Sequence, residues 1–162
     1  MSTANNVTRL LKARRIQFQV FELPAVKLGA RDTASLLGVP PGIIFKTIVV
    51  TRDGIGKPLL VLVPGSAVVD ARLVAAAVGA KKVHVTTERE AEAITGLQAG
   101  GISPLALIHR GFQVLVDASA RESEHIHVSG GERGLNIKLR TKDLVALTGA
   151  LLAPASKPDG LG

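Results

Sequence analysis

The stretch Gly100-Gly101-Ile102-Ser103-Pro104 combines residue types that suit a close approach of the backbone to a ligand. Glycine has no Cβ, so bare amides can reach a ligand, while proline stiffens the far end of the loop. Amides placed in this way can donate hydrogen bonds directly to a ligand. The stretch therefore predicts a binding or catalytic loop, with an ordinary tight turn as the simpler alternative.

An isolated lysine in Phe45-Lys46-Thr47 is the second such feature, and it opens a β-branched run that predicts a strand. Its ammonium is a compact donor of three hydrogen bonds, which suits an anionic ligand. The third feature is the segment Ser129-Gly130-Gly131-Glu132-Arg133-Gly134, which predicts a polar turn. Taken singly, a solvated strand lysine and two tight turns would explain these residues equally well.

Familiar phosphate-binding and metal-binding motifs do not account for these residues. A phosphate loop needs glycine directly before its lysine and a helix after it, whereas Phe45 precedes Lys46 and a strand-like run follows. The segment 129–134 has a serine where the dinucleotide fingerprint needs its first glycine. His125 and His127 alternate on one strand face, but no third ligand lies nearby, so we expect no metal.

A protein nucleophile is not evident either. The chain has no cysteine, which excludes disulfides, thiolate metal sites and a cysteine nucleophile. Ser129, a histidine and Asp117 do not make a hydrolase triad, because the G-x-S-x-G elbow is missing. We therefore expect no cofactor.

The charge of the chain favours an anionic partner. Its 162 residues carry 20 Lys and Arg against 13 Asp and Glu, a net charge of +7, which points to nucleic acid or a phosphorylated small molecule. Only 2% of residues are aromatic, so contacts with nucleic acid should involve phosphate and sugar more than base stacking. We find no apolar run of membrane-spanning length and no signal-peptide pattern, and therefore expect a cytoplasmic protein without a membrane partner.

Hydrophobic periodicity and capping residues predict a mixed α/β protein. Helices are expected at 4–14, 31–37, 71–78, 88–95 and 142–148. Strands are expected at 16–20, 44–51, 59–63, 82–85, 105–109, 113–116, 125–128 and 135–140, with a hairpin connection at 53–58. We predict one compact domain over residues 1–152, with a mostly antiparallel sheet, flanking helices and a flexible tail at 153–162.

The three features, in this order, resemble the YbaK/prolyl-tRNA synthetase editing-domain family of aminoacyl-tRNA deacylases. The resemblance covers nearly the whole chain, to about Leu147, and the Phe-Lys-Thr and Gly-x-x-x-Pro elements are its most specific parts. Further matching segments are Leu37-Gly38, Val63-Pro64, Gly79-Ala80-Lys81-Lys82-Val83, Thr95-Gly96, Asp117, Val128-Ser129-Gly130-Gly131 and Arg133-Gly134-Leu135.

The resemblance implies a domain built around a curved, barrel-like sheet, and hydrolysis of the ester that joins a wrong amino acid to the 3′-terminal ribose of a tRNA. It makes Lys46 the functionally important lysine and 100–104 the substrate-holding loop. In this hypothesis Gly100 and Gly101 offer their amides to the ester, and Lys46 positions substrate rather than acting as a base. The expected substrate contacts are Phe21, Phe45, Thr47, Ile102, Ser103, Pro104, Ser129, Gly130, Gly131, Arg133 and Asn136.

Two positions depart from the family pattern. The first strand reads Phe21-Glu22-Leu23-Pro24 where relatives tend to have an aromatic-acidic-histidine stretch, and Asn136 stands where they often have aspartate. The missing carboxylate removes an acceptor for the substrate ammonium, so these positions bear on which amino acid is removed. Cysteine is our first expectation and alanine the second.

The expected function is a free-standing trans-editing hydrolase that deacylates Cys-tRNA(Pro) or Ala-tRNA(Pro), by water or by substrate-assisted attack. Its partner is the aminoacylated 3′ end of tRNA, with prolyl-tRNA synthetase as a further candidate, and both a monomer and a homodimer are open. The alternative is a non-catalytic tRNA- or synthetase-binding module on the same fold. An esterase for small molecules is a third interpretation.

Overall fold

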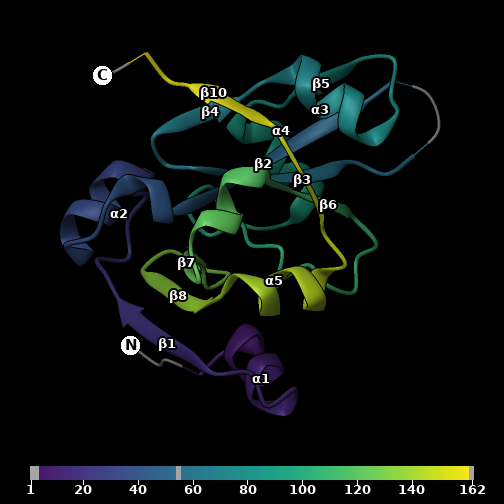
Figure 1. Cartoon of the computed structure of the whole chain (residues 1–162). Coiled ribbons are helices and arrows are strands. Elements are labelled where there is room, and N and C mark those ends of the chain that lie inside the picture. The colour runs from purple at the N-terminus through teal and green to yellow at the C-terminus, as the bar shows by residue number, and fades with distance from the viewer. Residues whose placement is uncertain (1–3, 54–55, 161–162) are drawn as a thin grey trace.

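The computed structural model describes residues 4–53 and 56–160, in which helices and strands alternate irregularly along the chain (Figure 1). The α-helices are α1 (Asn6–Ala13), α2 (Ala30–Leu37), α3 (Ala71–Val78), α4 (Glu88–Thr95) and α5 (Thr141–Thr148). The strands are β1 (Phe18–Glu22), β2 (Phe45–Arg52), β3 (Leu59–Pro64), β4 (Ala67–Val69), β5 (Val83–Val85), β6 (Gln113–Asp117), β7 (His125–Ser129), β8 (Leu135–Arg140), β9 (Leu151–Ala153) and β10 (Ser156–Pro158). Short 3-10 helices lie at Pro41–Ile43 and Ala118–Glu122.

Helix ends follow their sequence signals closely. The carboxylate of Asp70 accepts hydrogen bonds from the first turn of α3, and Thr87 and Glu90 form a reciprocal capping box on α4. Gly38 and Gly79 adopt left-handed conformations, with φ of 69° and 68°, and end α2 and α3 where the sequence predicts.

The strands form three sheets, in the orders β5-β2-β3-β6-β9, β1-β8-β7 and β10-β4. All described pairings are antiparallel except β3 with β6 and β6 with β9, so the mostly antiparallel arrangement is as expected. The barrel-like closure is not observed, because β5 and β9 remain at the two ends of the five-stranded sheet without pairing to each other. The sheets are instead joined by packing and by a bridge between Ile44 and His127.

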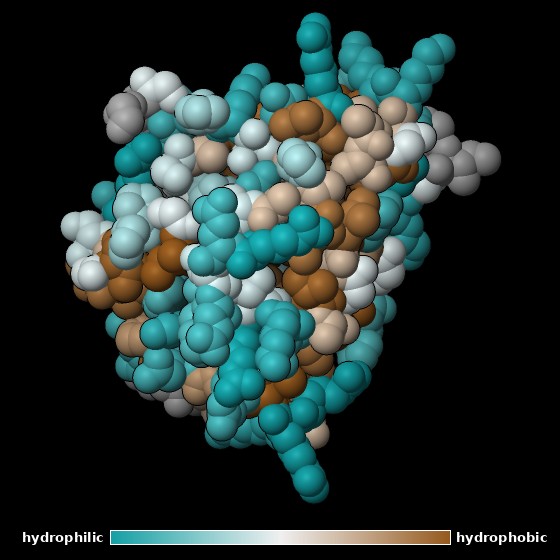
Figure 2. All heavy atoms as spheres, in the orientation of Figure 1, coloured by the Kyte–Doolittle hydropathy of each residue, from teal (hydrophilic) through white to brown (hydrophobic). Residues whose placement is uncertain are grey.

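Strand β3 lies at the centre of the core, with every one of its residues buried. Because side chains alternate along a strand, Leu60 and Leu62 pack into a cluster with α1, α5 and the β7–β8 sheet. Val61 and Val63 face the other way, into a cluster that includes Val74 of α3. The large exposed hydrophobic side chains of the described residues are spread over several elements, and Figure 2 shows hydrophilic side chains among the hydrophobic ones on this face.

The predicted strand at 105–109 is wrong, since residues 104–111 form turns. Pro104 lacks an amide donor, and the Ser103 hydroxyl accepts the Leu105 amide at 3.2 Å, which closes the chain locally. Leu105 and Leu107 are nevertheless buried, so their apolar character reflects core packing rather than a strand.

The C-terminal segment also differs from its prediction. Residues 151–153 and 156–158 form strands instead of a flexible tail, and Ala155 between them is fully buried. The buried carboxylate of Asp117 accepts the Ala155 amide at 2.8 Å, which holds this segment against β6. The hairpin predicted at 53–58 contains residues 54 and 55, which lie outside the described residues.

Candidate functional site

A cavity of about 300 Å³ opens between the 23–30 loop, the first half of β2, the N-terminus of α4 and the start of β8. Of the residues predicted to form the site, seven line this cavity: Phe45, Lys46, Thr47, Gly100, Ile102, Ser129 and Asn136. They come from segments far apart in the sequence. The fold therefore brings part of each of the three sequence features to one place.

Lys46 lies on β2, opposite Val63 of β3, and is half-buried in the cavity wall. Burial lowers its pKa below the usual value for lysine, an effect that the Asp159 carboxylate opposes and the Arg31 guanidinium reinforces. Asp159 is itself ion-paired with Arg31 at 2.7 Å. The C-terminal segment thus contributes to the charge environment of Lys46, a relation that no local sequence pattern indicates.

Phe45 and Thr47 flank the lysine on the same strand. Phe45 is 2% exposed and belongs to the core cluster, so it forms the floor of the cavity. The Thr47 hydroxyl is buried and has no hydrogen-bond partner among the described residues. Unpaired buried hydroxyls are uncommon and costly, so this oxygen is a candidate for a contact made only with ligand or water.

Gly100 sits at the rim with φ of 91°, a conformation that favours glycine. A Cβ at this position would lie 3.4 Å from Cα of Lys27, which shows how closely the 23–30 loop approaches. The described residues offer no hydrogen-bond acceptor to the Gly100 amide. This amide is therefore available to a ligand.

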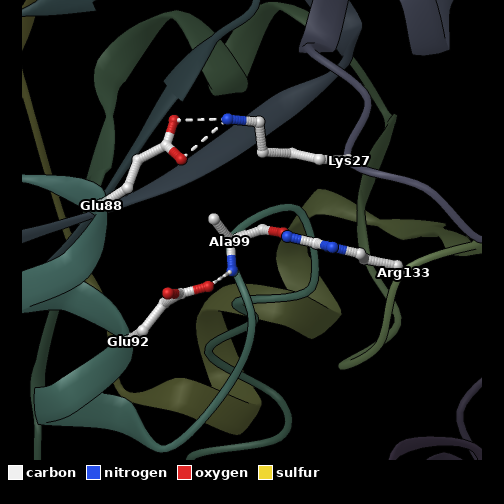
Figure 3. A network of polar contacts seen from close by, with 5 residues as sticks. All are labelled: Lys27, Glu88, Glu92, Ala99 and Arg133. Carbon is white, nitrogen blue, oxygen red and sulfur yellow. Dashed lines mark hydrogen bonds and ion pairs between the residues drawn. The ribbon is translucent and has the colours of Figure 1, made fainter.

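The peptide of Ala99, directly before Gly100, is held on both sides by charged groups (Figure 3). Arg133 Nε donates to the Ala99 carbonyl at 2.7 Å, and the Glu92 carboxylate accepts the Ala99 amide at 2.8 Å. Charge-assisted hydrogen bonds are stronger than neutral ones. This pair of contacts fixes the loop that presents the Gly100 amide.

Gly101 has a different role from the one that its sequence predicts. Its amide donates to the Gln98 carbonyl at 2.8 Å, so it is not available to an oxyanion. A Cβ on Gly101 would lie 2.9 Å from Cα of Glu132 and 3.0 Å from the backbone nitrogen of Arg133. Close packing of two loops, rather than ligand contact, explains this glycine.

The rest of the Gly100–Pro104 loop turns into the core. Ile102 is 8% exposed and lines the cavity. Ser103 is fully buried with its hydroxyl bonded to the Leu105 amide, and Pro104 is buried outside the cavity lining. Ser103 and Pro104 therefore shape the loop and do not face the cavity.

The Ser129–Gly134 turn reaches the cavity only at its two ends, Ser129 and Gly134. Gly130 is buried with its amide bonded to the Leu135 carbonyl, and the Gly131 amide donates to the Ser129 hydroxyl at 3.2 Å. Arg133 points to Ala99 instead of the cavity. Of the substrate contacts expected in this turn, only Ser129 therefore lines the cavity.

Asn136 lies in the cavity wall between Phe21 and Ser129, its partners on the neighbouring strands. Its side-chain oxygen is 2.7 Å from Nδ1 of the buried His127, and because an amide oxygen only accepts, Nδ1 carries the proton. Burial lowers the pKa of His127, the Asn136 hydrogen bond opposes this, and Lys138 reinforces it. Phe21 does not line the cavity; its ring lies 5.5 Å from the His127 ring.

Sequence reasoning missed two charged groups at the rim, Lys27 and Glu88, which form an ion pair at 2.9 Å. Glu88 directly follows the N-cap Thr87, and this position gave no sign of facing a cavity. No cluster of three or more His, Asp or Glu side chains suited to a metal ion occurs in residues 4–53 and 56–160. Within the same ranges, every helix is too short or too polar to cross a membrane.

These features form a cavity whose hydrogen-bond donors suit a small polar ligand. It offers an ammonium from Lys46, a loop amide from Gly100 and the amide side chain of Asn136. It resembles the sites of hydrolases that stabilise charge on an already reactive bond.

Comparison with known proteins identifies the family. The sequence profile described as the aminoacyl-tRNA editing domain matches residues 27–147. The candidate Cys-tRNA(Pro)/Cys-tRNA(Cys) deacylase EbsC of Enterococcus faecalis (strain ATCC 700802 / V583) is 31% identical over 150 residues, which cover 91% of this chain and 90% of that protein.

Two solved structures are also similar to this chain. The hypothetical protein APE2540 superposes with a TM-score of 0.86 at 25% identity, over 94% of this chain and all (100%) of that one. A candidate trans-editing enzyme for prolyl-tRNA synthetase gives a TM-score of 0.77 at 25% identity, over 96% of this chain and 99% of that one. The chain belongs to the aminoacyl-tRNA editing domain family. The family resemblance and the deacylase class of enzyme are thereby confirmed.

Proposed function

We propose that this protein is a free-standing trans-editing hydrolase that removes cysteine from Cys-tRNA(Pro), with Ala-tRNA(Pro) as the second candidate substrate. The cysteine preference draws support from the EbsC relative, itself a candidate Cys-tRNA(Pro)/Cys-tRNA(Cys) deacylase. A tRNA partner also suits the net charge of +7, because phosphate contacts by Lys and Arg supply much of the affinity for nucleic acid. The proposed location is the cytoplasm, where charged tRNA is used.

The observation that carries this proposal is the convergence of Lys46, Gly100 and Asn136 on one small cavity. Its volume of about 300 Å³ lies near the lower limit for small-molecule sites. A cysteinyl or alanyl group with part of the terminal ribose suits this size.

The reaction needs orientation and charge stabilisation more than a strong protein nucleophile, because an aminoacyl ester is already activated. The Gly100 amide would donate to the carbonyl oxygen as negative charge develops there. The Lys46 ammonium would bind the ribose or the terminal phosphate and hold the ester in place. Water would attack the carbonyl carbon, and the ribose hydroxyl would leave with a proton.

A cysteinyl substrate offers a second route that needs no base from the protein. Its thiol sulfur can attack its own ester carbonyl, the carbon–oxygen bond to the ribose breaks, and the thiol proton passes to the departing ribose oxygen. The product is a cyclic thioester that water then opens. This route suits a cavity whose lining, among the described residues, includes neither histidine nor cysteine.

The deciding experiment incubates the protein with a panel of mischarged tRNAs that includes Cys-tRNA(Pro), Ala-tRNA(Pro) and correctly charged Pro-tRNA(Pro). Acid-gel or radiolabel assays should show faster loss of cysteine than of proline. Background rates across the whole panel would reject the proposal. Repeating the assay with added prolyl-tRNA synthetase would show whether that enzyme is a partner.

A non-catalytic tRNA- or synthetase-binding module is the second candidate, favoured by Asn136, which removes a carboxylate from the site. This function predicts salt-sensitive tRNA binding without turnover. Binding and hydrolysis measured in the same sample separate the two candidates. Oligomeric state can be measured in parallel by light scattering.

A further inference from the structure

The cavity rim carries a single carboxylate among the described residues that line it, that of Glu88. Glu88 is the first residue of α4, and its side chain is 65% exposed. Its two oxygens lie 2.9 and 3.2 Å from the ammonium of Lys27, which is 53% exposed. Figure 3 shows this pair above the Ala99 peptide, next to the loop that carries Gly100.

The ion pair contributes little to folding and can therefore exchange partners easily. Exposed pairs of this kind contribute about 0–1 kcal/mol, because both charges remain well hydrated when they separate. Neither side chain is part of the hydrophobic core. Glu88 and Lys27 can therefore separate and form ion pairs with other charged groups at little cost in free energy.

The proposed substrate brings both of the charges that this pair would need. The α-amine of an aminoacyl group can carry a positive charge near neutral pH, since α-amino groups titrate at about 7.7–8.0 in peptides. The nucleotide on the other side of the ester carries a phosphodiester anion. One ligand therefore presents a cation and an anion on either side of the bond to be broken.

We propose that Glu88 is a specificity residue that accepts the α-ammonium of the aminoacyl group, while Lys27 turns to the phosphodiester of the terminal nucleotide. This inference rests on the proposed function. In this arrangement the Glu88 carboxylate on α4 takes the role of the carboxylate that is missing at Asn136 on β8. Lys27 also lies beside the amide donor, because a Cβ on Gly100 would be 3.4 Å from Cα of Lys27. The ammonium and carbonyl groups of one substrate would therefore meet neighbouring protein groups.

The competing explanation is that the ion pair of Lys27 and Glu88 only holds the 23–30 loop against α4. In that case, neutralising Glu88 would weaken binding of every ligand equally, with or without an amine. If Glu88 accepts the α-ammonium, as proposed, neutralising it weakens binding only of those ligands that carry the amine. This difference can be measured without any catalytic turnover.

The test compares wild type, Glu88→Gln and the control Glu90→Gln in binding amide-linked cysteinyl and alanyl derivatives of 3′-amino-3′-deoxyadenosine 5′-phosphate. Matching ligands lack the α-amine but keep the same acyl chain. Glu90 suits the control because it lies in the same helical turn but does not line the cavity. The glutamine oxygen can still accept the Thr87 amide that Glu90 accepts at 2.9 Å.

Glu88→Gln should weaken binding of the amine-bearing ligands about tenfold or more, equivalent to about 1.4 kcal/mol, and change binding of the deaminated ligands less than twofold. Glu90→Gln should leave both unchanged. Equal losses for both ligand types, or no loss for either, would overturn the inference. A protein that binds these ligands in the expected pattern but hydrolyses no mischarged tRNA would refute the proposed function alone.

Discussion

Substituting Gly101 by alanine separates close packing from ligand contact as the reason for this glycine. The added Cβ would lie 2.9 Å from Cα of Glu132 and 3.0 Å from the Arg133 nitrogen. Both are backbone atoms that cannot rotate away, so the two loops must separate. Gly101 does not have a positive φ, so alanine meets no conformational penalty and the contact alone sets the effect.

The expected losses of stability and of reaction rate follow from this close contact. Overpacking of a buried site costs about 1–3 kcal/mol. For a domain of this size, each kcal/mol lowers the melting temperature by about 2–4 °C, so we expect a decrease of about 2–12 °C. Separation of the loops also lengthens the 2.7 Å bond from Arg133 to the Ala99 carbonyl and displaces the Gly100 amide. A misplacement of about 1 Å can cost on the order of 10²-fold in rate.

Thermal unfolding and single-turnover deacylation of Cys-tRNA(Pro) would measure the two effects together. Gly42→Ala is the matched control, because a Cβ at Gly42 meets nothing within 4 Å and its φ is not positive. That control should change neither the melting temperature nor the rate appreciably. Loss of deacylation by Gly101→Ala without any loss of stability would contradict the packing argument and return Gly101 to the ligand site.

Three further changes test other parts of the structure. Lys46→Ala should lower the deacylation rate at least about tenfold, or about 1.4 kcal/mol of transition-state stabilisation, and near-normal turnover in single-turnover assays would remove Lys46 from the mechanism. Burial alone would raise the pKa of Asp117, but hydrogen bonds from Ser119, Ala155 and Ser156 lower it below its usual value. Its stabilisation is therefore fully present above the unfolded pKa of about 3.9 and is lost as pH falls through the folded pKa. Asp117→Asn should lower the free energy of unfolding by about 1.5–3 kcal/mol at pH 7, and this free energy should change less with acid pH than that of the wild type. Denaturant unfolding curves at pH 7 and below pH 4 that shift equally for both proteins would contradict this. Asn136→Asp should raise the pKa of His127 by placing a carboxylate beside Nδ1, and an NMR titration showing no rise would contradict that contact.

Local signals in the sequence were sufficient for most of the secondary structure. Asp70 and the Thr87–Glu90 pair determine helix ends through contacts within a few residues, so both could be read directly. The apolar alternation at Leu105 and Leu107 was misleading, because a turn can also bury residues two apart when it packs against a core. Short strands such as 156–158 were missed, since a buried carboxylate distant in sequence holds that segment in place.

The site was only partly predictable for a related reason. Lys46, Gly100 and Asn136 line the cavity together, and all three were expected at the site from the family resemblance. The contacts of Arg133 and Gly101 depend instead on how two glycine-rich loops meet, and neither loop carries that information alone. Glu88 was missed because an acidic residue in the first helical turn already has an ordinary explanation in the helix dipole.

In the proposed mechanism, the two loops together explain how a site with few catalytic groups can be selective. A free backbone amide is useful to an oxyanion only if it is already in place when charge develops, because reorganisation would consume the stabilisation. The Ala99 peptide is held from opposite sides by Arg133 and Glu92, and Gly101 is packed against the neighbouring turn. These contacts fix the Gly100 amide before substrate arrives. The exposed ion pair of Lys27 and Glu88 above this amide can change its conformation more easily. The backbone is therefore rigid where the ester would react, and the side chains can adjust where they would recognise the charged groups of the substrate.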